Sequence, residues 1–285
     1  MQSLTLPAPA KLNLFLHINR RREDGYHDLQ TVFQLLDFGD ELTFTPNTDN
    51  TIRFTCSNKS LEGDDNLVMK AAYSLQPFAR QFLGIDIYLN KILPAGGGIG
   101  GGSSDAATTL LALNYLWHCD LTADQLADIG RELGADIPVF VRGQSSFAEG
   151  VGERLQPLDL PKKWFIVLDP GCHVSTAKIF SHKRLTRDTP IIKVATSFGQ
   201  GTKNDCQPLV EELYSQVKEA RLWLDQFGQA RMTGTGCCVF LSVDDEDTAQ
   251  TIFKQRPKHI NGFVAKGVNT SPAVEQLSLS IATGV

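Results

Sequence analysis

The amino-acid sequence predicts a fold of the α+β class, in which strands and helices share a sizeable core. The chain has 285 residues, of which 42% are hydrophobic, enough for one large domain or two moderate ones. Near the N-terminus, apolar and polar residues alternate as they do in a strand. Further along, a strand, a glycine-rich loop and two successive helices follow one another. A parallel Rossmann unit would return to a strand after the first helix, so that alternative is disfavoured.

The N-terminal half is predicted to begin with a strand over Ala8–Ile18, where alternate residues from Leu12 onward are apolar. Its other face carries Lys11 and Asn13, and the turn signal Asp24-Gly25 follows an arginine-rich, exposed loop. The further elements expected before the glycine loop are strands His27–Leu36 and Ile85–Leu89, an antiparallel pair Asp40–Thr45 and Thr51–Cys56, and a helix from Leu67.

Two helices are predicted directly after the glycine loop, over Asp105–Asn114 and from the capping residue Thr122 to Leu133. The proline-containing segment Leu155–Lys163 is the best candidate boundary, giving domains 1–157 and 158–285. Beyond it we expect strand Trp164–Leu168, a helix capped by Ser175, the amphipathic region Pro208–Phe227, a glycine turn and strand over 232–243, helix Asp245–Gln255 and strand Gly262–Lys266.

The charge balance and the cysteines exclude several classes of function. With 27 basic and 32 acidic residues the net charge is −5, which gives no general attraction to nucleic acid or to an anionic membrane. The six cysteines form no C-x-x-C pair, so a zinc or redox motif has little support. The N-terminal segment lacks the pattern of a signal peptide, and no window is apolar over the length of a membrane span. We therefore expect a cytoplasmic protein.

The glycine loop at residues 94–104 is the strongest functional signal. It lies between a predicted strand and a predicted helix, with Ser103 or Ser104 as the expected N-cap. Glycines allow a ligand to approach the backbone closely, and a helix N-terminus offers free N–H groups to an anion. Flexible linkers are longer mixtures of Gly and Ser and do not abut a strand and a capped helix. The arrangement therefore predicts a phosphate site.

Two familiar phosphate-binding patterns do not account for the loop. A Walker A loop ends in Gly-Lys-Ser/Thr, and no lysine follows these glycines. The G-x-G-x-x-G spacing of Gly96, Gly98 and Gly101 is a weak match in so glycine-rich a run. Asp37-Phe38-Gly39 lies before the loop without a His-Arg-Asp motif, so it does not indicate a protein kinase.

Phosphoryl transfer from ATP to an alcohol also needs a group to take the hydroxyl proton and a cation to balance charge. Asp136 and Lys11 are the candidates that the sequence offers. From the pattern alone, Lys11 reads more readily as a solvated strand residue and Asp136 as a local turn residue. The spacing does not show that they meet.

Five sequence motifs resemble those of a known family, and they occur in this chain in the same order as in that family. The glycine loop resembles the phosphate loop of the galactokinase, homoserine kinase, mevalonate kinase and phosphomevalonate kinase superfamily, the GHMP kinases. The other four motifs are Pro9-Ala-Lys-Leu-Asn13, Asp24-Gly-Tyr-His27, Gly134-Ala-Asp-Ile-Pro138 and Thr233-Gly-Thr-Gly236. Together the five resemble the branch that phosphorylates the 2-hydroxyl of a methylerythritol carrying a cytidine diphosphate, in the non-mevalonate isoprenoid pathway. The Pro-Ala-Lys-Leu-Asn and Gly-Tyr-His motifs are the two that narrow the resemblance to this branch.

The resemblance covers essentially the whole chain and implies a two-domain fold, ribosomal-protein-S5-like at the N-terminus and ferredoxin-like at the C-terminus. It implies Asp136 as the general base and Lys11 as its catalytic partner. The cytidine-diphosphate alcohol would contact Asn13, Tyr26, His27, Val151 and Phe180, with the base between Tyr26 and Phe180. ATP would contact Asn66, Lys91, Pro94, Ala95, Gly96, Gly97, Gly98, Ile99, Gly100, Gly101, Gly102, Ser103 and Ser104. Mg²⁺ would accompany ATP, with Ser104 as a possible contact.

The resemblance implies small-molecule partners, without nucleic acid or membrane, for a monomer or weak homodimer. Two alternatives stay open: another GHMP kinase acting on homoserine or mevalonate, or a non-catalytic ATP-binding protein. The polar stretch Thr186–Thr202 matches no motif, and its role is open.

Overall fold

The computed structural model describes residues 3–81, 84–193 and 201–283 of the chain. Its sheet runs in the order β3-β4-β2-β10-β7-β9-β8, with β1 and β5 also paired to β2 and β6 paired to β5. The strands are β1 Leu4–Arg21, β2 His27–Asn47, β3 Ile52–Cys56, β4 Gly84–Asn90, β5 Ser146–Glu149, β6 Arg154–Pro157, β7 Trp164–Asp169, β8 Arg231–Met232, β9 Val239–Val243 and β10 Asn261–Val268.

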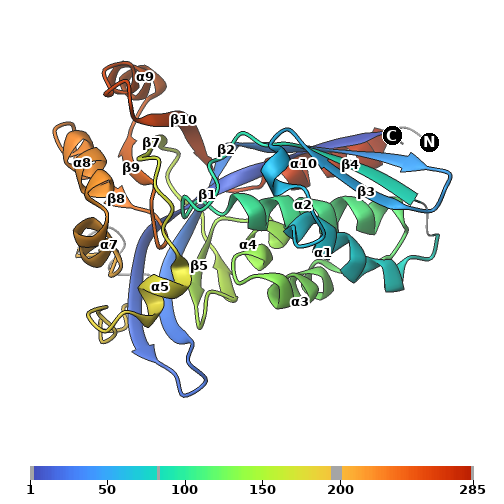
Figure 1. Cartoon of the computed structure of the whole chain (residues 1–285), viewed down its shortest axis with the longest axis horizontal. Coiled ribbons are helices and arrows are strands. Elements are labelled where there is room, and N and C mark those ends of the chain that lie inside the picture. The colour runs from blue at the N-terminus through green and yellow to red at the C-terminus, as the bar shows by residue number, and fades with distance from the viewer. Residues whose placement is uncertain (1–2, 82–83, 194–200, 284–285) are drawn as a thin grey trace.

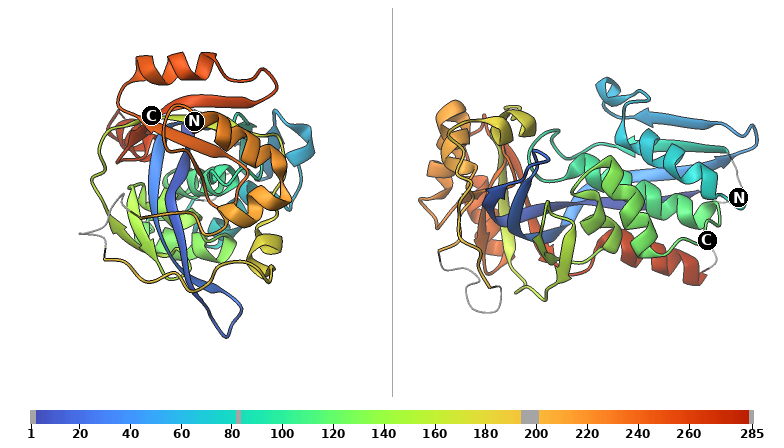
Figure 2. Two further views of the ribbon diagram at one scale, coloured as in Figure 1. Left: turned by 90° about the vertical axis from the view of Figure 1, so that its left-hand side faces the viewer. Right: turned by 90° about the horizontal axis from the view of Figure 1, so that it is seen from below.

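The helices divide into two groups along the molecule. Figures 1 and 2 show α1–α4 on one face of the sheet and α7–α9 gathered near β7–β9. Their bounds are α1 Leu67–Leu75, α2 Gly101–Leu116, α3 Ala123–Leu133, α4 Ile137–Arg142, α5 Thr176–Ser181, α7 Gln207–Leu213, α8 Ser215–Leu224, α9 Glu246–Lys254 and α10 Pro272–Thr283, with 3₁₀ turns at Lys59–Leu61 and Gln76–Phe78. The mixed sheet and these helices confirm the α+β class.

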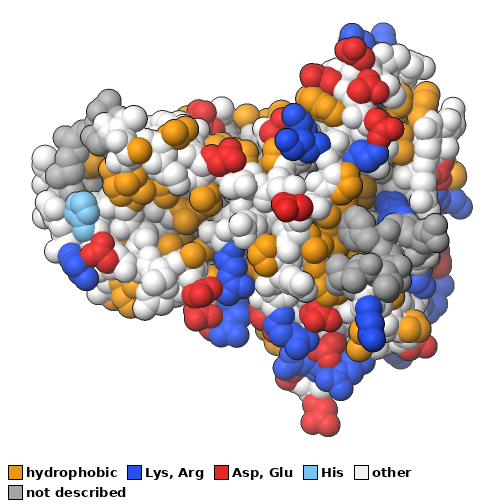
Figure 3. Space-filling model, turned by 180° about the vertical axis from the view of Figure 1, so that it is seen from behind, with side chains coloured by type: hydrophobic (Ala, Val, Ile, Leu, Met, Phe, Trp, Pro, Cys, Tyr) orange, Lys and Arg blue, Asp and Glu red, His pale blue; other side chains and the backbone are white. Residues whose placement is uncertain are grey.

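The long hairpin of β1 and β2 connects the two parts of the core. One buried cluster joins β1, β2 and β4 to α1–α4 and includes Leu6, Phe33 and Trp117. A second cluster, built on β7–β10, also takes in Leu12 and Ile18 of β1. Two successive stretches of one strand thus supply the two cores. The tip of this hairpin carries exposed charged side chains, as expected (Figure 3).

The predicted hairpin of Asp40–Thr45 with Thr51–Cys56 is wrong. β2 continues unbroken to Asn47. β4 lies between β2 and β3, antiparallel to β2 and parallel to β3. Helix α1 makes the crossover from β3 to β4. Local alternation identifies strands, but a strand's partner depends on contacts that are distant in sequence.

Two helix predictions also change, and helices α4 and α10 were not predicted. α2 begins at Gly101 with Gly100 as N-cap, so neither Ser103 nor Ser104 is the cap. The amphipathic region 208–227 is divided into α7 and α8 at Tyr214. The unpredicted helix α10 packs against β1 and α2, and Gln276 donates to the carbonyl of Thr5 at 2.8 Å. The division at 157/158 stays a prediction, with the C-terminal helix lying on the N-terminal half.

No helix in the described ranges is both long and apolar enough to cross a membrane.

Candidate active site

The glycine loop is closely packed on both of its sides. Gly98 and Gly100 have φ angles of +75° and +76°, which residues with a Cβ rarely adopt. A Cβ on Gly98 would lie 2.4 Å from the carbonyl oxygen of Thr233, and one on Gly100 would lie 2.8 Å from the Phe140 ring. The loop therefore needs glycine at these two positions both for its conformation and for its contacts.

The loop leads into the N-terminus of α2, and the N-terminus of a helix attracts anions. The first N–H groups of a helix have no intrahelical acceptors and are available to a ligand. Ser103 lines a cavity that Lys11 and Asp136 also line. Ser104 is fully buried, and its hydroxyl has no hydrogen-bond partner among the described residues. This geometry suits the binding of a phosphate group.

Lys11 joins the glycine loop to Asp136. Its side chain is only 2% exposed, and its ammonium group donates to Asn13 Oδ1 at 2.5 Å and to the Gly98 carbonyl at 3.0 Å. The same nitrogen lies 3.2 Å from Asp136 Oδ2 and 5.4 Å from the centre of the Phe33 ring. Lys11 is thus a buried cation with three oxygen partners, rather than a solvated strand residue.

Asp136 is the N-cap residue of α4, but its side chain makes no capping hydrogen bond. With 35% of that side chain exposed, the carboxylate lines the same cavity as the much more deeply buried Lys11. One oxygen meets the lysine. The carboxylate is therefore both ion-paired and accessible to a substrate.

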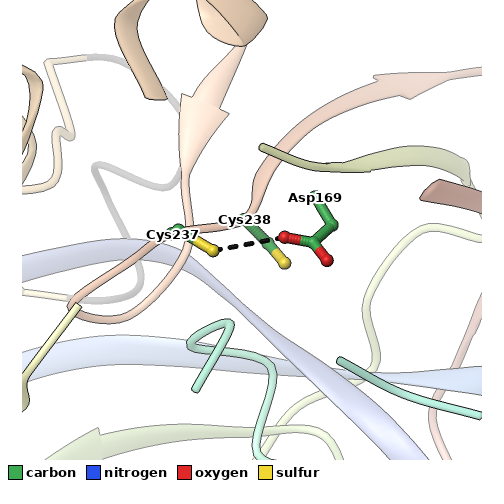
Figure 4. Close-up of side chains that lie close together, drawn as sticks. All are labelled: Asp169, Cys237 and Cys238. Atoms are coloured by element: carbon green, nitrogen blue, oxygen red, sulfur yellow. Dashed lines mark hydrogen bonds between the residues drawn. The ribbon is translucent and has the colours of Figure 1, made fainter. Parts of the chain in front are cut away.

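A turn at residues 233–238 closes the loop from the C-terminal side. Thr233 accepts a hydrogen bond from the Asn13 N–H at 2.9 Å, and Cys238 N–H donates to the Gly97 carbonyl at 3.0 Å. Figure 4 shows Cys237 and Cys238 beside Asp169, whose Oδ1 accepts from the Cys237 thiol at 3.3 Å. The two Sγ atoms and a carboxylate oxygen of Asp169 lie within 4.8 Å of one another. The hydrogen bond between the Cys237 thiol and this carboxylate accounts for their closeness. The turn is thus fixed to β1, β7 and the glycine loop.

A cavity of about 510 Å³ opens between these elements. Of the residues predicted for the site, it brings together Lys11, Asn13, Tyr26, His27, Gly98, Gly100, Ser103, Asp136, Val151 and Phe180. Its volume is in the usual range for a small-molecule site.

One wall of the cavity is aromatic. Tyr26 is 65% exposed, whereas His27 is 6% exposed. The rings of His27 and Phe180 have centroids 5.1 Å apart. Burial, and secondarily the nearby Arg187 and Arg21, lowers the pKa of His27 below its usual value. This wall can hold a flat ring against aromatic faces and offer it a neutral imidazole.

Of the residues predicted to contact ATP, Asn66 and Lys91 are not among those that line this cavity, and neither are Pro94, Ala95, Gly96, Gly97, Ile99, Gly101, Gly102 and Ser104. Asn66 caps α1 by accepting from the Val68 N–H at 2.8 Å, while its amide donates to the Leu61 carbonyl at 2.9 Å. Lys91 is buried between Asp40 and Asp105, at 2.5 and 2.8 Å from their carboxylates. Their contact with adenosine stays a prediction.

The buried group around Lys91 supports the glycine loop from behind. Asp40 accepts from the N–H groups of Ile92 and Leu93 at 2.5 and 2.7 Å. Burial raises the pKa of Asp105 to about 7, with Lys91 opposing this shift and Asp40 reinforcing it. These contacts tie the segment before the loop to the first turn of α2.

The structure adds cavity residues that the sequence did not single out. Phe33 and Thr31 of β2 face the cavity beside Lys11 and Asn13, and Thr176 and Thr235 hydrogen-bond to each other at 2.8 Å. Thr235 belongs to the Thr-Gly-Thr-Gly motif, which was a usable signal. The other three lie in ordinary strand or helix-start patterns, so their sequence gave no such signal.

Comparison with known proteins identifies the class to which this fold and site belong. The family model described as "GHMP kinases N terminal domain" matches residues 66–144, and "GHMP kinases C terminal" matches residues 191–261. The chain belongs to the GHMP kinases. The prediction of an ATP-dependent small-molecule kinase with a GHMP-kinase-like fold is confirmed.

Individual relatives narrow the assignment. A 4-diphosphocytidyl-2-C-methyl-D-erythritol kinase of Hahella chejuensis is 52% identical, covering 97% of each chain. One of Marinobacter nauticus is 54% identical, covering 96% of this chain and 98% of its own. Within its class, the chain belongs to the 4-diphosphocytidyl-2-C-methyl-D-erythritol kinase family.

Solved structures agree with this assignment. A crystal structure of 4-(cytidine 5'-diphospho)-2C-methyl-D-erythritol kinase superposes with a TM-score of 0.81 at 32% identity, over 93% of this chain and 99% of that one. A mevalonate kinase superposes with a TM-score of 0.70 at 15% identity, over 93% and 99% of the two chains. The second likeness concerns the fold alone.

Proposed function

We propose that this chain transfers the γ-phosphoryl group of ATP to the 2-hydroxyl of 4-diphosphocytidyl-2-C-methyl-D-erythritol, giving the 2-phosphate and ADP. The observation that carries the proposal is the cavity itself. It joins a phosphate-binding loop, an accessible carboxylate paired with a buried lysine, and an aromatic wall. Membership of the kinase family supports the choice of substrate.

Asp136 acts as the general base in this proposal. Its carboxylate takes the proton of the 2-hydroxyl as that oxygen forms a bond to the γ-phosphorus, while the bond from phosphorus to the ADP oxygen breaks. Lys11 holds the carboxylate in place by its ion pair and balances the negative charge that spreads over the phosphoryl oxygens. Its position 3.2 Å from Asp136 and 3.0 Å from the loop carbonyl of Gly98 suits both tasks.

The glycine loop and the start of α2 bind the phosphates of ATP in this proposal. Mg²⁺ prefers oxygen ligands. The loop offers Ser103 at the cavity wall and the buried Ser104 hydroxyl, which has no hydrogen-bond partner among the described residues. These hydroxyls fit such an ion. When bound, Mg²⁺ would neutralise part of the phosphate charge.

The cytosine ring lies between Tyr26 and Phe180 in this proposal, with His27 at its polar edge and Val151 alongside. Asn13 faces the polyol or the diphosphate. Tyr26 and Phe180 come from segments far apart in sequence that line one cavity, and aromatic faces stabilise a stacked base. A cytoplasmic location and a monomeric or weakly dimeric state stay predictions from the sequence.

Phosphorus NMR of the reaction product tests the proposal. The carbon that carries the 2-hydroxyl also carries the methyl group and has no hydrogen. A phosphate placed there gives a monoester signal without three-bond coupling to a carbinol proton. A coupled signal would mean that another hydroxyl is the acceptor, and the absence of a new monoester would contradict the reaction.

A further inference from the structure

Arg187 makes a specific contact with the substrate wall of the cavity. Its Nε–H donates to Nε2 of His27 at 2.9 Å. Its remaining N–H groups donate to the carbonyls of Leu185 at 3.0 Å, Phe180 at 2.8 Å and His182 at 2.8 Å. Four hydrogen bonds therefore hold the guanidinium between His27 and the segment that follows α5.

The contact fixes the protonation pattern of the imidazole. A guanidinium has donors only and stays charged in proteins. Nε2 of His27 must therefore accept, which requires a neutral ring with its proton on Nδ1. Among the described residues no other hydrogen bond reaches this ring, so Nδ1–H is the donor left for a ligand in the cavity.

The segment that carries Arg187 is itself tied to the β1–β2 hairpin. Thr189 N–H donates to the carbonyl of Ile18 at 3.1 Å. The Gln30 amide exchanges two hydrogen bonds with the backbone of Ile192, at 2.9 and 3.1 Å. Residues 186–193 belong to the polar stretch that matched no motif in the sequence, while residues 194–200 lie outside the described part. These contacts give Arg187 a defined position.

We propose that Arg187 is a positioning residue that selects the base of the substrate by fixing the His27 tautomer. Cytosine presents a hydrogen-bond acceptor at N3, where uracil presents an N–H donor. A ring that can only donate from Nδ1 accepts cytosine and leaves two donors facing each other with uracil. This inference rests on the proposed function, because it takes a cytidine-diphosphate alcohol as the ligand.

The charge state of His27 agrees with this arrangement. Burial and Arg187 both lower the pKa of His27. A protonated ring would place an N–H donor against the guanidinium. Both effects favour the neutral ring, and with it the donor pattern.

Nitrogen–proton correlation NMR of the ligand-free protein tests the tautomer directly. We expect the wild type to carry the proton on Nδ1 and Arg187→Met to shift His27 toward the Nε2–H form. Arg184→Met is the matched control, since Arg184 pairs with Glu212 on the exposed surface and should leave the His27 signals unchanged. A wild-type ring protonated on Nε2 would overturn the inference even if the variant failed to fold.

Turnover with paired substrates tests the selection. For wild type we expect kcat/KM to favour the cytosine substrate over its uracil analogue by roughly 10- to 100-fold, the usual effect of one mismatched donor. Arg187→Met should reduce this ratio about tenfold with the KM for ATP unchanged, and Arg187→Lys should restore part of it. An unchanged ratio in Arg187→Met would overturn the inference. Failure of the wild type to turn over the cytosine substrate would instead sink the proposed function, while the tautomer measurement would still judge the role of Arg187.

Discussion

The ammonium nitrogen of Lys11 lies 3.2 Å from Oδ2 of Asp136, although the lysine is in β1 and the aspartate precedes α4. The lysine side chain is 2% exposed and that of the aspartate 35% exposed. A buried cation thus holds a carboxylate that a substrate can reach. The acid–base chemistry that we propose depends on this pair.

Asp136→Asn should lower kcat by about 10²–10⁴-fold, because an amide cannot take the hydroxyl proton. ATP affinity should be nearly unchanged, since the phosphate loop is intact. Steady-state kinetics and calorimetric ATP binding measure the two effects. Asp124→Asn serves as the control, because Asp124 is an exposed residue of α3. Substantial activity in the Asp136 variant would rule out this residue as the base.

Gly98→Ala should weaken ATP binding and lower the melting temperature. The new Cβ would lie 2.4 Å from the Thr233 carbonyl, in a backbone conformation with φ of +75°. Gly102→Ala is the matched control, because its Cβ would meet only Leu67 at 3.8 Å and alanine favours the helix by up to about 1 kcal/mol. Equal effects of the two variants on ATP affinity would show that the close packing of Gly98 is unimportant.

His27→Ala should raise the KM for the cytidylyl substrate by roughly tenfold or more, through the loss of one hydrogen bond in a buried site. The KM for ATP should change little, because the His27 ring contacts Arg187 and Phe180, neither of which belongs to the glycine loop. His259→Ala provides a control on the exposed surface. A loss confined to ATP affinity would mean that the ring serves the nucleotide side instead.

Asp105→Asn should flatten the dependence of stability on pH. Burial raises the pKa of Asp105 in the folded protein to about 7, above its value near 3.9 in the unfolded chain. The folded state therefore binds the proton more tightly, and this stabilisation, complete below about pH 4, is lost as the pH rises through about 7. Melting temperatures of wild type relative to the variant should fall between pH 4 and 8. If the melting temperature of the wild type instead rose relative to that of the variant over this range, the raised pKa of Asp105 would be contradicted.

Local patterns in the sequence were sufficient for much of the fold. Alternation found β1 and β4, and the capping residue Thr122 found the start of α3, where the structure has a full capping box. The partner of β3 and the start of α2 were mispredicted, because pairing and close packing depend on residues distant in sequence. Helix α10 was missed altogether.

The candidate site divides in the same way. Lys11 and Asp136 were found through motifs. The local pattern alone favoured a solvated strand residue for Lys11 and a turn residue for Asp136. Arg187 could not be found, because a single arginine in a polar segment has no signature and its contact with His27 is long-range. Lys91 was named through the resemblance as a contact of ATP, but the two buried carboxylates beside it are visible only in the structure.

The most direct test of the central claim is ADP release by the purified protein with MgATP and each of three alcohols. These are 4-diphosphocytidyl-2-C-methyl-D-erythritol, homoserine and mevalonate. We predict turnover with the cytidylyl substrate alone. Turnover with homoserine or mevalonate would keep the kinase class and discard the roles of Tyr26, His27 and Phe180. Protein that is folded and binds ATP, yet turns over none of the three, would contradict the account and point to a non-catalytic protein.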